Sequence, residues 1–201
     1  MSEPTTPSND AVIAAMRHWV EAAVISLNLC PFAKTVQRKG QVRYVVSSAR
    51  TEDQLLADLR NELSHLHATP VRVTDNTLLI HPHVLQEFFV FQAFLSRADA
   101  TVRRAGLRGV IQIASFHPQY QFAECEPEDL GNFTNRAPYP TLHLLREASI
   151  ARAAESFPTE TIYEHNIETL NKLGHAGWEK LGIGPAGATE AGGVDEEERG
   201  L

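Results

Sequence analysis

The sequence contains few cysteines, no long hydrophobic run and no excess of positive charge. Cys30 and Cys125 are the two cysteines in 201 residues, which excludes a disulfide framework. The most apolar segment, residues 11–30, is interrupted by Arg17 and Glu21, so it is typical of an amphipathic helix and not of a membrane span. The formal net charge of −7 argues against binding to nucleic acid or to an anionic membrane.

The composition predicts one compact domain with polar ends. The first residues, MSEPTTPSND, lack the apolar core of a signal peptide, so we expect a cytoplasmic protein. Hydrophobic residues make up 43% of the sequence, enough for a sizeable core. We expect a disordered leader at residues 1–9, a single α/β domain at residues 10–183 and a disordered acidic tail at residues 184–201.

Hydrophobic periodicity predicts strands that alternate with helices. Helical spacing marks residues 10–28, 51–67, 85–106, 141–156 and 167–173, and strands are predicted at residues 41–48, 77–80 and 109–116. This order predicts an α/β or α+β fold with a small, mixed or partly parallel sheet of three or four strands, flanked by helices and extended by N- and C-terminal helices. If residues 71–73 also form a strand, the order becomes the ferredoxin-like βαββαβ, and the sequence leaves both orders open.

The side chains best suited to chemistry are concentrated between residues 115 and 147. Ligands of open sheets bind beyond the carboxyl ends of the strands, and two of the predicted strands end at His81 and His117. His81 and His83 are equally consistent with a solvated loop.

A histidine and a glutamate four residues apart offer two kinds of site. On the last helix predicted in this segment, His143 and Glu147 can ligate one divalent metal, with His117 as a third ligand. Alternatively, Arg136 and Arg146 bind a small anion through their planar guanidinium groups, and His117 or His143 transfers a proton. The spacing also fits an ordinary His–Glu pair on a helix surface.

The irregular segment 117–140 is rich in hydrogen-bond donors. Such side chains either bind a ligand or fix the loop to the core, because buried loop backbone needs polar partners. The residues that we expect to bind substrate are Asn135, Arg136, Tyr139, Arg146 and Lys34.

Cys30 stands at the predicted beginning of a short helix. Unpaired amides there, with Lys34 one turn further on, would lower the pKa of the thiol and make it a nucleophile or a redox group. The alternative is a small buried side chain that follows the apolar residues Leu27 and Leu29.

Four motifs together resemble one bacterial family, catalogued as domain of unknown function 1415. They are LNLCPFAK at 27–34, TLLIHP at 77–82, ASFHPQYQFA at 114–123 and TNRAPYPTLHLLREAS at 134–149. The resemblance covers roughly residues 10–182 and implies a bacterial, cytoplasmic protein without assigning an activity. The segment CPFA at 30–33 is also similar to the active-site turn of omega-class glutathione transferases, which implies Cys30 as a redox nucleophile.

These observations favour an enzyme, a hydrolase or a transferase, that acts on a small anionic molecule in a pocket formed by residues 115–147. His117, His143 and Glu147 would perform acid–base or metal-assisted chemistry. The first alternative is thiol-dependent chemistry of the glutathione type at Cys30. The second is a module that binds a ligand or a protein without catalysis. The sequence does not predict the oligomeric state.

Overall fold

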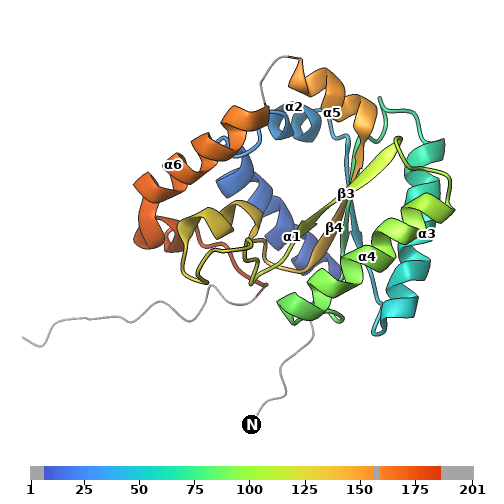
Figure 1. Cartoon of the computed structure of the whole chain (residues 1–201), viewed down its shortest axis with the longest axis horizontal. Helices are drawn as coiled ribbons and strands as arrows, with labels where there is room; N and C mark the ends of the chain where they lie inside the picture. Colours follow the sequence, from blue (N-terminus) through green and yellow to red (C-terminus); the bar gives the residue numbers. More distant parts are fainter. Residues whose placement is uncertain (1–6, 156–158, 187–201) are drawn as a thin grey trace, which may run out of the picture.

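The computed structural model describes residues 7–155 and 159–186 and is built around one mixed sheet (Figure 1). Its four strands are β1 (Val42–Val46), β2 (Asn76–Ile80), β3 (Ile111–Phe116) and β4 (Thr141–Arg146), in the order β1-β2-β4-β3. β1 and β2 are parallel, and β4 is antiparallel to both of its neighbours, β2 and β3. The predicted class, a small mixed sheet flanked by helices, is confirmed.

Two long helices cover one face of this sheet. α3 (Glu52–Ala68) connects β1 to β2, and α4 (Phe88–Arg104) connects β2 to β3 (Figure 1). The capping box expected at the beginning of α3 is present: the Thr51 hydroxyl accepts from the Gln54 amide at 3.3 Å, and the Gln54 side chain accepts from the Thr51 amide. The core between helices and sheet includes Leu59, Phe91 and Leu142, all fully buried.

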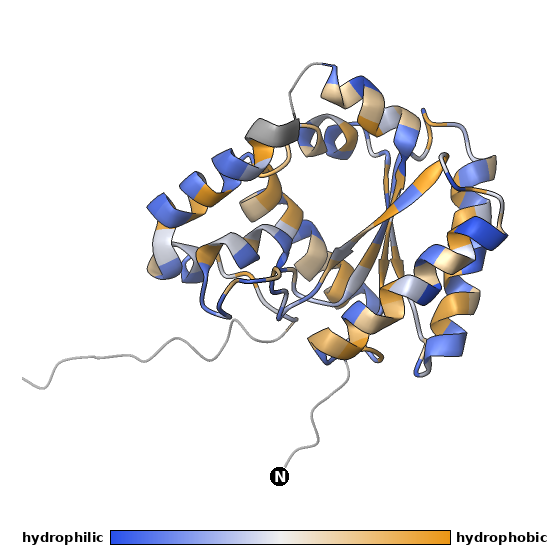
Figure 2. Cartoon of the chain, in the orientation of Figure 1, coloured by the Kyte–Doolittle hydropathy of each residue, from blue (hydrophilic) through white to orange (hydrophobic). Residues whose placement is uncertain are grey.

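The opposite face is covered by helices from the two ends of the chain. α1 (Asn9–Trp19) continues into a π-helical segment, η1 (Val20–Ile25), and α6 (Thr159–Glu179) packs on the 3-10 segment η2 (Leu130–Asn135). Apolar residues of α1 and α6 join Leu78 and Ile80 of β2 in one buried cluster, and polar residues lie on the outer side of α6 (Figure 2).

Two short helices lie near the amino ends of β1, β2 and β3. α2 (Ala33–Arg38) leads into β1, and α5 (Glu147–Ala154) follows β4 directly; both appear at the top of Figure 1. Because β4 runs against its neighbours, its carboxyl end delivers α5 to the same edge of the sheet from which the parallel strands begin.

Two sequence-based expectations are corrected. The helix predicted at 141–156 is wrong over its first part, because 141–146 forms β4 and only the residues from Glu147 onward are helical. Pairing on both sides buries this strand, and its alternate leucines, Leu142 and Leu144, are fully inaccessible in the α3–α4 core. Residues 71–73 form a turn, so the order is βαβαββ and not the ferredoxin-like alternative.

The predicted domain limits fall close to the ends of the described chain. Ser8, in the predicted leader, begins α1 by accepting a hydrogen bond from the Ala11 amide at 3.2 Å. Residues 1–6 and 187–201, most of the predicted leader and tail, lie outside the described residues. Among the helices that the structure describes, none combines the length and apolar character needed to cross a membrane.

Candidate functional site

A cavity of about 390 Å³ lies over the face of the sheet that α1 covers, bounded by η1, α2 and α5. We call it the sheet-face pocket. It runs along this face from Phe116, at the carboxyl end of β3, to the amino ends of the parallel strands, at Val42, Asn76 and Gln112. The side chains with polar atoms that line it are Trp19, Cys30, Asp75, Asn76, Gln112, Thr134, Asn135, His143 and Ser149.

The lining of the sheet-face pocket is largely apolar and almost uncharged. Asp75 is the one charged residue among the described residues that line it, and it accepts a hydrogen bond from Oγ of Ser149 at 2.6 Å. Within the described part of the chain, this lining contains no lysine or arginine. An apolar cavity with a few polar groups is typical of sites for small organic molecules.

His143 projects into the pocket from the centre of the sheet. It pairs with Leu78 of β2 and Ala114 of β3, and its ring lies 5.9 Å from that of Phe116, between centroids. Burial lowers the pKa of His143 to about 4, so the imidazole is neutral at pH 7. Nε2 bonds to Oδ1 of Asn76 at 3.2 Å; donation from Nε2 leaves the lone pair on Nδ1, which has no hydrogen-bond partner among the described residues.

Cys30 lies in the turn between η1 and α2. Its amide donates to the Val24 carbonyl at 3.3 Å, and the backbone amides of Phe32 and Ala33 face its sulfur. Burial raises the pKa of the Cys30 thiol, and this effect outweighs the two amides, which lower it. The predicted lowering is therefore wrong in its net direction, and Lys34, which is exposed, does not line the pocket.

The histidines at the carboxyl edge of the sheet serve the backbone. Nε2 of His117 bonds to the Leu85 carbonyl at 3.2 Å, and Nδ1 accepts from the Gln119 amide at 3.0 Å. Nδ1 of His81 bonds to the Val84 carbonyl at 3.0 Å. Both rings lie against Phe91 of α4, with centroids 5.3 Å away for His117 and 5.4 Å for His81, so they hold the loop that precedes this helix.

The predicted metal ligands are not brought together. His117 packs under α4 on one face of the sheet, whereas His143 lines the pocket on the other. The helical spacing expected between His143 and Glu147 does not exist, because His143 belongs to β4 and Glu147 begins α5. Within residues 7–155 and 159–186, no three histidine, cysteine, aspartate or glutamate side chains are grouped to hold a metal ion.

The two predicted anion-binding arginines bind the main chain. Arg146 donates to the carbonyls of Leu66 and Thr69, each at 2.5 Å, and also to that of Thr74. Neither arginine lines the pocket.

Arg136 fixes the 117–140 loop. It donates to the Tyr120 carbonyl at 3.2 Å and to the Pro127 carbonyl at 2.5 Å, and its guanidinium lies 4.4 Å from the centroid of the Phe133 ring. These contacts join separate parts of the loop to one another.

Of the other predicted ligand-binding residues, Asn135 reaches the pocket and Tyr139 does not. Nδ2 of Asn135 donates to the Ser115 carbonyl at 3.1 Å, and the Tyr139 hydroxyl accepts from the Ala186 amide at 2.8 Å. Trp19 and Asn76 also line the pocket, and neither was predicted to do so. Strand alternation in the TLHLLR segment was the available signal, since it places His143 on the face opposite the buried leucines.

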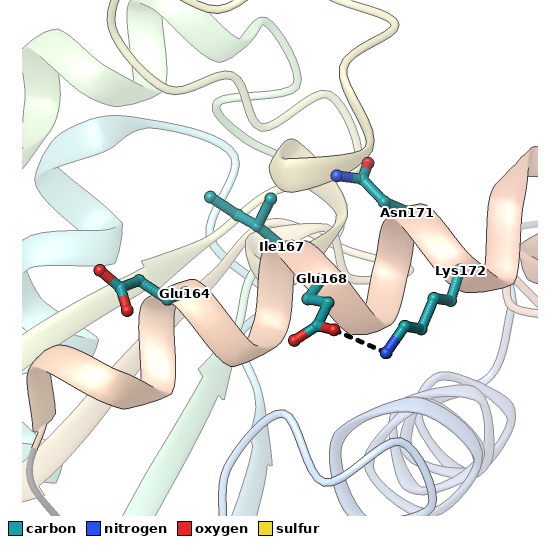
Figure 3. Close-up of a pocket in the computed structure, with 5 residues that line it drawn as sticks. All are labelled: Glu164, Ile167, Glu168, Asn171 and Lys172. Carbon is teal, nitrogen blue, oxygen red and sulfur yellow. Dashed lines mark hydrogen bonds and ion pairs between the residues drawn. The ribbon is translucent and has the colours of Figure 1, made fainter.

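A second hollow lies along α6 (Figure 3). Its lining residues all come from this one helix: Glu164, Ile167, Glu168, Asn171 and Lys172. Glu168 and Lys172 form an ion pair at 2.6 Å, with more than half of each side chain exposed. Because this hollow is lined by a single helix, it does not bring together side chains from different elements. The sheet-face pocket is therefore the better candidate site.

A family model with the description "Protein of unknown function (DUF1415)" matches residues 11–180. No curated protein and no solved structure matches the chain.

Proposed function

The chain belongs to the DUF1415 family of proteins of unknown function, and we propose that it binds a small uncharged molecule in the sheet-face pocket and acts on it through the thiol of Cys30. His143 is the proton acceptor in this proposal. The observation that carries it is that Cys30 and His143, from distant parts of the chain, line one cavity.

The electrostatics of the lining favour an uncharged partner. An anion in this cavity would lose its hydration without gaining a lysine or arginine partner, and Asp75 would repel it. Glutathione carries two carboxylates, so we do not expect it to be the substrate. In place of the small anion expected from the sequence, we therefore propose a neutral molecule with a largely apolar surface.

The chemistry needs a base because a thiol of raised pKa is a weak nucleophile. Sγ of Cys30 forms a bond to an electron-poor carbon of the bound molecule as the thiol proton passes to Nδ1 of His143. The electron pair displaced from that carbon departs with a leaving group or, if the carbon belongs to a double bond, moves to the adjacent atom. The leaving group or that atom then takes the proton back from His143. A thiolate forming in the pocket raises the proton affinity of His143, so the two charges develop together.

The test is the rate at which neutral acrylamide modifies Cys30, followed by mass spectrometry in a Cys125→Ser background. We expect native protein to react with acrylamide. We also expect Cys30 to react more slowly with the anion iodoacetate than with uncharged iodoacetamide, and the ratio of these two rates should be larger than it is for free cysteine. In His143→Gln we expect the rate to fall about tenfold or more, since general bases contribute on the order of 10²–10⁴.

The matched control is His67→Gln, which alters an exposed histidine of α3 and should leave the rate unchanged. Unaltered reactivity in His143→Gln would overturn the role of the imidazole. Reaction of Cys30 only after unfolding would overturn the role of the thiol.

A further inference from the structure

We infer that the molecule bound in the sheet-face pocket carries a neutral carbonyl group, whose oxygen accepts hydrogen bonds from Trp19 and Thr134. This inference rests on the proposed function, because it specifies the ligand of the same pocket. It starts from two polar atoms that have no partner in the described part of the chain.

The first of these atoms is Nε1 of Trp19. This residue lines the pocket from the end of α1, and only 2% of its surface is exposed. Its indole contacts the ring of Phe116 edge-on, with centroids 4.9 Å apart, which fixes the indole orientation. Buried donors are nearly always paired in native proteins, so an unpaired indole N–H on a pocket wall calls for an explanation.

The second atom is Oγ1 of Thr134, near the end of η2. It is buried without a partner, and Thr134 also lines the pocket. Its neighbour Asn135 is already engaged with the Ser115 carbonyl. Trp19 and Thr134 thus both line the cavity, and each carries a buried polar atom without a partner among the described residues.

The chemistry of these groups defines their partner. An indole nitrogen donates and never accepts, so the ligand group must be an acceptor. A carbonyl oxygen has two lone pairs and can accept from the indole and from the hydroxyl together. A carboxylate or phosphate would also accept, but it would bring a negative charge into a lining without lysine or arginine. A neutral ketone, ester or amide with an apolar remainder fits both the donors and the apolar walls.

The experiment compares two probes with the same carbon skeleton, acetophenone and ethylbenzene, which differ in the carbonyl oxygen. Dissociation constants are measured with the full chain by isothermal titration calorimetry, and pocket occupancy is checked by protection of Cys30 from acrylamide. We expect acetophenone to bind about tenfold more tightly than ethylbenzene, the ratio that corresponds to one or two net hydrogen bonds.

Two substitutions connect this preference to the donors. Thr134→Val keeps the shape of the side chain and should reduce the preference, and the double variant Trp19→Phe/Thr134→Val should abolish it. Thr77→Val is the matched control, because Oγ1 of Thr77 is also buried and unpaired but Thr77 does not line the pocket. This control should keep the wild-type preference.

The outcomes separate this inference from the proposed function. If neither probe binds or protects Cys30, the small-molecule function itself fails. If both bind equally to the wild type, the pocket stands and the carbonyl assignment is overturned. Tighter binding of benzoate than of acetophenone would overturn the neutrality of the ligand, and a preference that persists in the double variant would overturn the assignment of the donors.

Discussion

At the scale of single residues, environment gives identical side chains different roles. His81 and His117 bond to carbonyls of the loop before α4, whereas His143 bonds to one side chain and faces a cavity. Sequence position alone indicated chemistry for His117 and His143 and left His81 open between a strand-end site and a solvated loop. Their separation depends on the face of the sheet to which each belongs.

The buried histidines make the stability of the fold sensitive to acid. Burial lowers the pKa of His81 to about 4, below the value of about 6.5 expected in the unfolded chain. The neutral ring therefore contributes stability that is fully present above pH 6.5 and is lost as the pH falls toward 4. For His81 we expect the free energy of unfolding to decrease by about 3 kcal/mol over this interval.

This pH dependence is measured by urea denaturation between pH 7 and pH 4. In His81→Asn, the amide can replace the bond from Nδ1 to the Val84 carbonyl but does not titrate, so the slope should become shallower. His67→Asn, at an exposed position, should keep the wild-type slope. Equal slopes in wild type and His81→Asn would show that His81 is not the group responsible.

Arg146 is predicted to stabilise the fold and not the site. Substitution by methionine leaves the carbonyls of Leu66, Thr69 and Thr74 without this donor. We expect the free energy of unfolding to fall by roughly 2–4 kcal/mol, since each unsatisfied buried group costs about 1–3 kcal/mol. Arg60→Met, on the exposed side of α3, is the control. Slower acrylamide modification of Cys30 in folded Arg146→Met would contradict this assignment.

At the scale of elements, local signals predicted most of the structure. The capping box of α3 and the apolar runs of β1, β2 and β3 were recognised because their determinants lie within a few neighbouring residues. TLHLLR at 141–146 was misassigned because its leucines also fit helical spacing. Its true state depends on insertion between β2 and β3, which is a tertiary contact.

The break in α6 gives a prediction at this scale. Gly174, where the sequence predicts the end of a helix, interrupts α6 with φ 68° and ψ 171°, a region essentially restricted to glycine. Gly174→Ala should lower the free energy of unfolding by about 1–3 kcal/mol in denaturant titrations. Gly131→Ala is the control, because its added Cβ would lie 3.6 Å from Ile167, an ordinary contact. Equal stability of the two variants would be evidence against backbone strain at Gly174.

At the scale of the whole molecule, the position of the candidate site follows from the chain topology. The carboxyl ends of the strands alone do not predict it. We expected a pocket beyond the carboxyl ends of the parallel strands, but that edge holds the buried rings of His81 and His117. The sheet-face pocket instead lies over the face of the sheet, from Phe116 at the carboxyl end of β3 to the amino ends, where α2 and α5 border it. Its walls come from segments more than a hundred residues apart, so their meeting could not be predicted from local patterns.

The central claim is that Cys30 and His143 share this pocket. The most direct test is to record NMR spectra of the histidine rings before and after acrylamide modifies Cys30 in the Cys125→Ser protein. The propionamide adduct should shift the ring signals of His143 and leave those of His81, on the other side of the sheet, in place. Unchanged His143 signals in a folded, fully modified protein would contradict the account.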